Sequence, residues 1–201
     1  MIKLLGRIPD SVIVACSGGP DSMALLSFLK NSNRSVTVLH FDHRTEHSME
    51  ARTLVESYCQ TNDLPVITKE LPDIPDNVSS LEAWWRDRRY EVMNSFSGTV
   101  VTGHNLDDVA EWWIFTSLRG NACLMPYQTR NVIKPFLLNT KKSLEGWCDR
   151  HDVPYVVDPT NLGERFARSK IRNNIMPEAL QVNPGFLTTM KKKIIEINES
   201  K

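Results

Sequence analysis

A pair of glycines between a hydrophobic run and a helix-like stretch carries the clearest chemical signal in this sequence. The hexapeptide Ser17-Gly18-Gly19-Pro20-Asp21-Ser22 stands at this junction. Glycines let backbone N–H groups approach an anion without a side chain in the way, and a helix start adds unpaired N–H donors and a positive dipole end. Asp21 and Ser22 are also residue types that cap helices. The hexapeptide therefore predicts a phosphate-binding loop.

This loop lacks the signatures of the two common nucleotide-binding loops. It contains neither G-x-G-x-x-G nor the lysine of the G-x-x-x-x-G-K motif. Without a lysine that reaches a terminal phosphate, the loop suits pyrophosphate as a leaving group. Ser-Gly-Gly alone would equally fit an ordinary strand-to-helix turn, and only the complete hexapeptide in this position favours phosphate binding.

Asp42 is the second candidate, because it follows the next hydrophobic run. It lies in the segment HFDHR, which ends at Arg44, where an open α/β sheet presents groups to a ligand. A carboxylate at this position would hold Mg²⁺ or orient a substrate amine. An exposed loop aspartate is the alternative interpretation.

The segment EAWWRDRRY places three charged side chains at helical spacing. Glu82, Arg86 and Arg89 stand at i, i+4 and i+7 and so share one helix face. Arginines bind phosphate oxygens in bidentate fashion. A solvated Glu–Arg pair, which stabilises a helix only slightly, is the alternative.

A histidine and three carboxylates begin a further expected helix in the segment GHNLDDVAE. His104, Asp108 and Glu111 share one face, and Asp107 lies beside them. Such a cluster is costly because like charges raise one another's pKa, and it is favoured beside a cation such as lysine or Mg²⁺. An acidic helix N-terminus stabilised by the dipole is the alternative. The absence of H-E-x-x-H excludes a zinc protease site of that type.

Hydrophobic runs alternate with helix-like stretches along most of the chain. The expected strands cover residues 11–17, 36–41, 66–71 and 99–103. The helices that follow them cover residues 21–30, 48–61, 81–96 and 106–119. Weaker signals indicate strands at 132–137 and 155–157, and helices at 140–151 and 184–198. This order predicts an α/β fold with a doubly wound, mostly parallel sheet, in which ligands bind beyond the carboxyl ends of the strands.

Composition narrows the class of protein. The 201 residues carry a formal net charge of zero, which argues against coating nucleic acid through bulk charge but leaves room for a local basic face. No apolar run approaches the ~20 residues that span a bilayer, and Pro9 and Asp10 interrupt any signal-peptide pattern, so a cytoplasmic protein is expected. Buried reduced thiols are expected for the four scattered cysteines, which form no C-x-x-C pair.

Taken together, these strings resemble the tRNA(Ile)-lysidine synthetases, a branch of the PP-loop ATP pyrophosphatases. The hexapeptide resembles SGGxDS, HFDHR resembles HVDHGLR, and EAWWRDRRY resembles E-A-x-x-R-x-x-R-Y. GHNLDDVAEWWIFTSLRG resembles H-H-x-D-D-x-x-E-T…L-x-R-G, and KPFL, from Lys134, resembles R-P-L-L. DPTN, from Asp158, and RSKIR, from Arg168, with Pro177 resemble D-P-S-N…R-N-x-I-R…P. The resemblance runs from about Val12 to Leu180.

The resemblance implies an adenine nucleotide alpha hydrolase-like fold and a two-step reaction. ATP, with Mg²⁺, would adenylate the 2-carbonyl oxygen of the wobble cytidine in a tRNA(Ile) with a CAU anticodon. The ε-amine of free L-lysine would then displace AMP and form lysidine. Relatives are often dimeric, so a homodimer is a family expectation.

The resemblance also implies roles for individual residues. The loop from Ser17 to Ser22 would hold the phosphates, with Asp21 and Asp42 as metal ligands. Asp42 and Asp108 would bind Mg²⁺ or the lysine ammonium, a division that stays open. Glu111 would recognise lysine. Arg86, with Arg89, would neutralise the charge on the α-phosphate. His104 would orient that phosphate. Arg168 and Arg172 would close on the phosphates or the tRNA.

The resemblance divides the chain at about residue 158. Residues 1–158 would form the PP-loop domain, and residues 159–201 a short basic helical tail that completes the active site and contacts tRNA. Many relatives carry one or two further C-terminal domains, so this chain is expected to be a compact form. Three departures from the family pattern would retune ATP or lysine binding: Arg44 for glycine, Trp112 for threonine and Ser169 for asparagine.

Three alternatives remain open from the sequence. A tRNA 2-thiolation enzyme would need paired cysteines, which the sequence lacks. A small-molecule synthetase, such as GMP or NAD synthetase, would share the loop. A non-catalytic nucleotide- or RNA-binding module would not require so many costly charges, which are Asp21, Asp42, Arg86, His104 and Asp108.

Overall fold

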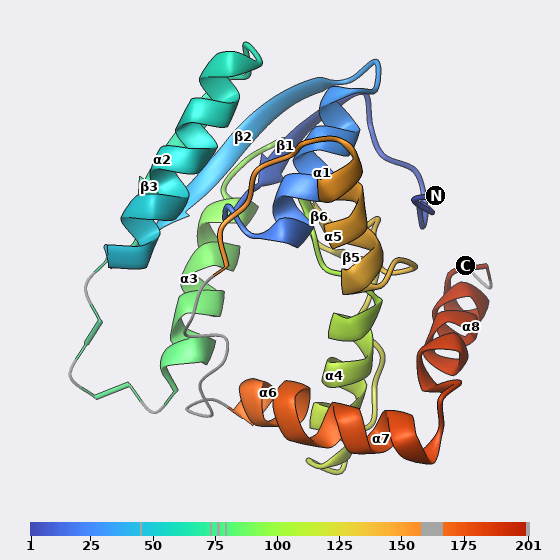
Figure 1. Ribbon diagram of the computed structural model, residues 1–201. Helices are drawn as coiled ribbons and strands as arrows, with labels where there is room; N and C mark the ends of the chain where they lie inside the picture. The colour runs from blue at the N-terminus through green and yellow to red at the C-terminus, as the bar shows by residue number, and fades with distance from the viewer. Residues whose placement is uncertain (45, 73, 76, 79, 158–166, 200–201) are drawn as a thin grey trace.

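A six-stranded sheet forms the centre of the molecule (Figure 1). The computed structural model describes residues 1–44, 46–72, 74–75, 77–78, 80–157 and 167–199. The strand order is β3-β2-β1-β4-β6-β5. The strands are β1 (Ser11–Ala15), β2 (Ser35–Asp42), β3 (Val66–Glu70), β4 (Val100–Thr102), β5 (Gln128–Thr129) and β6 (Val132–Ile133). All neighbouring pairs are parallel except β5–β6, which confirms the doubly wound, mostly parallel sheet.

Helices cover both faces of this sheet because its strands are apolar on both sides. Successive side chains of a strand point to opposite faces, so Val38 joins one core cluster and Leu39 another. The first cluster lies under α1 (Pro20–Lys30), α2 (Glu46–Thr61) and α5 (Lys141–Arg150). The second lies under α3 (Leu81–Asn94) and includes Met93. The strands are thereby fixed from two sides.

The last helices pack on α4 (Leu106–Ser117) rather than on the sheet. They are α6 (Ala167–Lys170), the π-helical turn η2 (Ile171–Ile175), α7 (Met176–Val182) and α8 (Phe186–Glu199). A third core cluster joins Val109 and Ile114 of α4 to Ile171, Met190 and Ile194. Figure 1 shows α6 and α7 crossing the end of α4, with α8 beyond them. The C-terminal segment therefore lies against the helix that carries Asp108 and Glu111.

The structure corrects several expected boundaries. The strand expected at 132–137 ends at Ile133, because Pro135 has no N–H for the ladder. No strand forms at 155–157, where Val156 N–H donates one hydrogen bond to Gly18 O at 2.9 Å. The DPTN segment lies outside the described residues. Within the described ranges, no helix is both long and apolar enough to cross a membrane.

Candidate active site

The glycine loop is held in shape by its own serines. Ser22 Oγ donates to Gly19 O at 3.0 Å and accepts from Ser17 N–H at 3.1 Å. Gly19 is the N-cap of α1, without a side-chain cap, so the expected capping role of Asp21 and Ser22 is wrong. Gly18 has φ +84°, and a Cβ there would lie 3.2 Å from Ala51 Cβ. This position therefore requires glycine.

Gly103 brings the end of β4 against the start of α1. A Cβ at Gly103 would lie only 2.8 Å from Asp21 O, so a side chain is sterically excluded at this contact. Because Gly103 contacts the backbone of the loop, His104, the next residue, is placed beside the loop. The segments that follow β1 and β4, which carry predicted site residues, thus lie against each other.

Asp21 carries a carboxylate oxygen without a partner. Within the described residues, its Oδ1 is buried and accepts no hydrogen bond. Burial, and then the charge of Asp108, raise the pKa of Asp21 to about 7, while Lys141 and Asn105 act in the opposite sense. A buried carboxylate that is destabilised in this way is a site that a cation would relieve.

Asp108 connects this carboxylate to the C-terminal segment. It forms a capping box with Asn105, in which Asn105 N–H donates to Asp108 Oδ2 at 2.9 Å and Asp108 N–H donates to Asn105 Oδ1 at 3.1 Å. Asp108 Oδ1 lies 3.6 Å from Arg172 Nη2 and 3.9 Å from Arg168 Nη2. The predicted carboxylate and both predicted arginines thus come together.

Glu111 is paired rather than open. Arg172 donates from Nε to Oε1 at 2.6 Å and from Nη2 to Oε2 at 2.9 Å. Burial raises the pKa of Glu111, while the hydrogen bonds from Arg172 act in the opposite sense. Both carboxylate oxygens of Glu111 are therefore engaged by this guanidinium.

His104 is neutral at physiological pH. Burial lowers its pKa to about 4; the charge of Asp108 opposes this shift, and Lys134, Arg168 and Arg89 add to it. Its Nδ1 lies 2.8 Å from Thr102 Oγ1, which orients the ring. Nε2 is then the atom through which His104 would meet a ligand.

Arg89 of α3 lies near enough to His104 and Tyr90 for its charge to act on both. Burial raises the pKa of the Tyr90 phenol, and the charges of Arg86, Arg89 and Arg168 act against this shift. Arg86 is exposed and contacts Asp87 at 3.2 Å. The side chain of Glu82, the third member of the expected face, lies outside the described part.

Asp42 has a separate set of contacts. Its Oδ1 accepts hydrogen bonds from Arg44 N–H and Ser48 Oγ, both at 2.8 Å, and its Oδ2 lies 3.3 Å from Arg52 Nη1. Burial works against its ionisation, but these hydrogen bonds outweigh burial and lower its pKa. Asp42 ends β2 at the sheet edge that bears the loop, yet these bonds tie it to α2 and to the turn after β2.

Lys134 is a buried cation that residue spacing did not single out. Its Nζ donates to Pro126 O and Thr129 Oγ1, both at 3.2 Å, and burial lowers its pKa to about 8. The sequence could have indicated this burial, because Lys134 stands within an apolar run, directly before Pro135. The capping pair Asn105 and Asp108 was readable as well, because an Asn-x-x-Asp spacing is a capping-box pattern.

The carboxylates fit Mg²⁺ only in part. The unpartnered oxygen of Asp21 and the nearby charge of Asp108 suit a divalent cation, whereas the oxygens of Asp42 already have protein donors. Across the described ranges, no group of three or more His, Cys, Asp or Glu residues is arranged to hold a metal ion. Mg²⁺ commonly binds through one or two carboxylates plus phosphate oxygens and water, which matches a pair of aspartates beside a phosphate loop.

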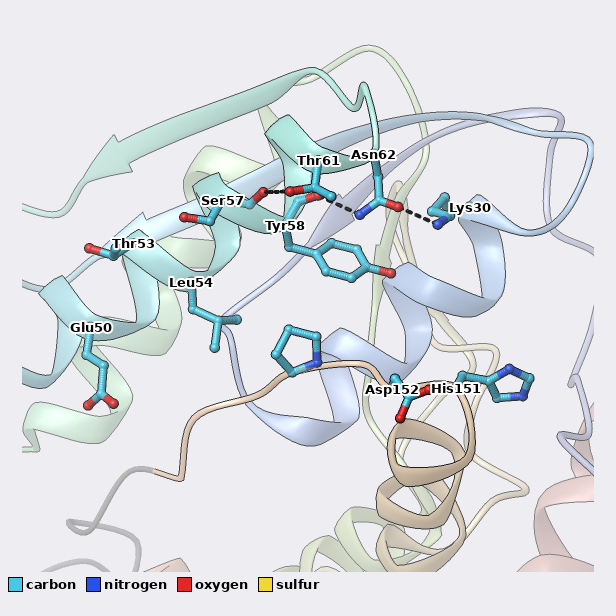
Figure 2. Close-up of a pocket in the computed structure, with 11 residues that line it drawn as sticks. Lys30, Glu50, Thr53, Leu54, Ser57, Tyr58, Thr61, Asn62, His151 and Asp152 are labelled. Atoms are coloured by element: carbon cyan, nitrogen blue, oxygen red, sulfur yellow. Dashed lines mark hydrogen bonds between the residues drawn. The ribbon is translucent and has the colours of Figure 1, made fainter.

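One hollow of the described structure lies away from these residues. It has a volume of about 750 Å³ and lies between α1, α2 and the turn after α5 (Figure 2). Lys30, Tyr58 and Asp152 are among its lining residues. None of the predicted site residues lines it.

Comparison with known proteins assigns most of the chain to a family. A family profile described as a PP-loop domain matches residues 4–179. The chain belongs to the PP-loop family. The matched region contains the loop, Asp42, Arg86 and Arg89 of α3 and the α4 cluster, and it extends through the C-terminal arginines.

Two curated relatives of this PP-loop chain carry the name tRNA(Ile)-lysidine synthase. The tRNA(Ile)-lysidine synthase of Thermotoga maritima is 32% identical over 194 residues, which cover 87% of this chain and 46% of that protein. The tRNA(Ile)-lysidine synthase of Francisella philomiragia is 27% identical, over 94% of this chain and 51% of that protein. The chain thus spans about half the length of these relatives.

Solved structures share the fold. The U34-tRNA thiolase NcsA of Methanococcus maripaludis, determined with its 4Fe–4S cluster, superposes with a TM-score of 0.76 at 15% identity, over 97% of this chain and 75% of that chain. The ammonia-dependent NAD synthetase of Campylobacter jejuni superposes with a TM-score of 0.53 at 13% identity, over 94% and 86% of the two chains. At these identities the likeness shows the architecture alone.

Proposed function

We propose that this PP-loop chain attaches lysine to the wobble cytidine of a tRNA(Ile) with a CAU anticodon, and that it consumes ATP to AMP and pyrophosphate. The observation that carries the proposal is the convergence of Asp21, His104 and Asp108 with Arg168 and Arg172 beside the glycine loop. The relatives named tRNA(Ile)-lysidine synthase supply the substrate class. The proposed substrate would place the reaction in the cytoplasm.

In the first step, the 2-carbonyl oxygen of cytidine attacks the α-phosphorus of ATP. A P–O bond to this oxygen forms, the bond to the β-phosphate breaks, and pyrophosphate leaves into the loop formed by residues 17–22. Arg86, Arg89 and Arg168 would neutralise the charge that develops on the α-phosphate. Neutral His104 would donate a hydrogen bond from Nε2 when Thr102 occupies Nδ1 as a donor. Mg²⁺ held by Asp21 and Asp108 would supply further charge neutralisation.

In the second step, the neutral ε-amine of lysine attacks C2 of the adenylated base. A C–N bond forms, the C–O bond to AMP breaks, and the nitrogen then loses a proton. Asp108 is the proposed acceptor of that proton, because Arg172 engages both oxygens of Glu111. Glu111 would contribute to lysine recognition indirectly, by holding Arg172 in position. Asp42 would bind the ammonium group of lysine if the side chain of Arg52 moved away from it.

A tRNA thiolation enzyme is the alternative function, because a tRNA thiolase shares the fold of this chain. In this chain, however, Cys16, Cys59 and Cys148 are buried in the core under α1, α2 and α5, and all four cysteines are free. Burial raises the pKa of these three thiols. Sulfur transfer requires an accessible thiolate, so the lysidine reaction is the better supported proposal.

One assay tests the proposal. The chain is incubated with ATP, Mg²⁺, L-lysine and unmodified tRNA(Ile), and the nucleosides are analysed by mass spectrometry. We expect a cytidine that gains the mass of lysine less water, in amounts matched by AMP. Pyrophosphate release that does not depend on tRNA would instead indicate a small-molecule synthetase, and no ATP turnover with any substrate would indicate a binding module.

A further inference from the structure

A small hollow beside the candidate site is lined by two lysines and no carboxylate. It has a volume of about 260 Å³ and lies between the N-terminal segment, the start of α5 and α8. Lys3 and Lys191 contribute the charges, and Thr140, Ser143 and Thr188 contribute hydroxyl groups. None of its ten described lining residues is acidic.

The two lysines are held in place around this hollow. Asn139 pins the backbone of Lys3, accepting from Lys3 N–H at 2.8 Å and donating to Lys3 O at 2.7 Å. Lys191 Nζ donates to Leu138 O at 2.9 Å, which leaves its other protons for a ligand. Burial, and then the charge of Lys3, lower the pKa of Lys191. Among the described residues neither lysine forms an ion pair, and an anion that binds between two such cations would stabilise both.

The hollow shares a wall with the candidate active site. Leu106 lines the hollow, and two residues later Asp108 faces Arg168 and Arg172. Leu106 N–H donates to Asn139 O at 2.8 Å, and Lys141 N–H donates to Asp107 Oδ2 at 2.8 Å. The first turn of α4 therefore separates the hollow from the site by the width of one helix.

We propose that the Lys3–Lys191 hollow binds a backbone phosphate of the RNA substrate, next to the nucleotide that reacts. This inference rests on the proposed function and adds to it a docking point outside the ATP loop. ATP already has a phosphate site in residues 17–22, so a second cationic hollow on the far side of the first turn of α4 matches the other polyanion of the reaction. An RNA strand that places one base in the site carries phosphates on both sides of that base.

The test is RNA binding measured against salt. Fluorescence anisotropy with a labelled anticodon stem-loop of tRNA(Ile) is recorded over a series of KCl concentrations for Lys3→Gln, Lys191→Gln and the double variant. Lys69→Gln is the matched control, because Lys69 is an exposed lysine on the edge strand β3. Binding of a fluorescent ATP analogue is measured in parallel.

We expect each hollow variant to bind RNA roughly three- to tenfold more weakly at low salt, and to lower the slope of log K against log salt by about 1. ATP binding should stay unchanged. Affinity and slope equal to those of Lys69→Gln would overturn the inference, as would a loss of ATP binding with intact RNA binding. Lys3 is held through its backbone, so Lys3→Gln should fold even if Lys191→Gln does not.

The failures of the two proposals are distinguishable. If the unaltered chain forms lysidine and the hollow variants bind RNA normally, the docking inference is wrong and the proposed function stands. If the unaltered chain neither binds the RNA nor modifies it, both proposals fail.

Discussion

Arg172 donates two parallel hydrogen bonds to Glu111, from Nε to Oε1 at 2.6 Å and from Nη2 to Oε2 at 2.9 Å. The same guanidinium lies 3.6 Å from Asp108 Oδ1. It projects from the π-helical turn η2, a type of distortion that is frequent at functional sites. One side chain therefore joins the C-terminal segment to two carboxylates of α4.

Removing this guanidinium should affect both stability and activity. In Arg172→Ala, the buried Glu111 loses its counter-ion; breaking a fully buried pair costs about 3–5 kcal/mol. The Arg172 side chain is 36% exposed, so we expect a smaller loss of about 2 kcal/mol in urea unfolding. Glu111→Gln combined with Arg172→Ala should recover part of this loss in a double-mutant cycle. Additive single effects would show that the pair is not coupled.

Asp21 predicts a pH-dependent free energy of unfolding. Its pKa is raised from 3.8 to about 7, so between these values the folded state retains a proton that the unfolded chain has released. The contribution of Asp21 to stability is full below about pH 4 and is lost as the pH rises to about 7. At 1.36 kcal/mol per pKa unit, this loss is at most about 4 kcal/mol. We expect Asp21→Asn to flatten the slope and to raise the thermal midpoint at pH 8.

Asp149→Asn, on the exposed side of α5, is the control for that experiment and should leave the slope unchanged. Mg²⁺ should raise the thermal midpoint of the unaltered protein and have a smaller effect on Asp21→Asn. The same variant should lose about a hundredfold or more in ATP turnover, the size seen when a charge-stabilising group is removed from an active site. If the free energy of unfolding of Asp21→Asn depended on pH as steeply as that of the unaltered protein, the raised pKa of Asp21 would be contradicted.

The layers of the fold were readable because apolar β-branched runs alternate with helices. A helical tail was expected at residues 159–201, but the separate helices α6, η2 and α7 within it were not, because their stability comes from packing on α4 rather than from a local pattern. Pro177, within the first turn of α7, suits a helix start, but the preceding run ARSKIRNN has no clear apolar period.

Part of the candidate site could be predicted from the sequence, because the carboxyl ends of parallel strands meet at one edge of the sheet. This rule placed the loop and His104 together, and helical spacing placed Asp108 beside Glu111. The pairing of Arg172 with Glu111 was not readable, because 61 positions separate the two residues. The bonds from Ser48 and Arg52 to Asp42 depend on how α2 lies against β2, which a sequence pattern does not specify.

His104 predicts acid sensitivity of the opposite sign to that of Asp21. Its pKa falls from 6.5 to about 4 on folding, so the unfolded chain binds a proton first. The free energy of unfolding should fall as the pH drops from about 6.5 to about 4, and His104→Gln should weaken that dependence. Activity should not decline near pH 6 through protonation of His104. Thr102→Val should lower kcat by releasing the ring, whereas Thr102→Ser, which retains the hydroxyl, should restore it; equal activities would contradict the orienting role.

Arg44 occupies a backbone conformation that suits glycine, the residue usual in the related motif. Its φ is +56°, and left-handed geometry costs a residue with a Cβ roughly 1–2 kcal/mol. Its exposed pairing with Glu70 at 2.8 Å returns at most about 1 kcal/mol. We therefore expect Arg44→Gly to stabilise the protein by about 1 kcal/mol in urea unfolding, with the N–H bond to Asp42 retained. Glu70→Gln isolates the ion pair and should cost less than about 1 kcal/mol; a destabilised Arg44→Gly would mean that the side-chain contacts of Arg44 outweigh the strain of its backbone.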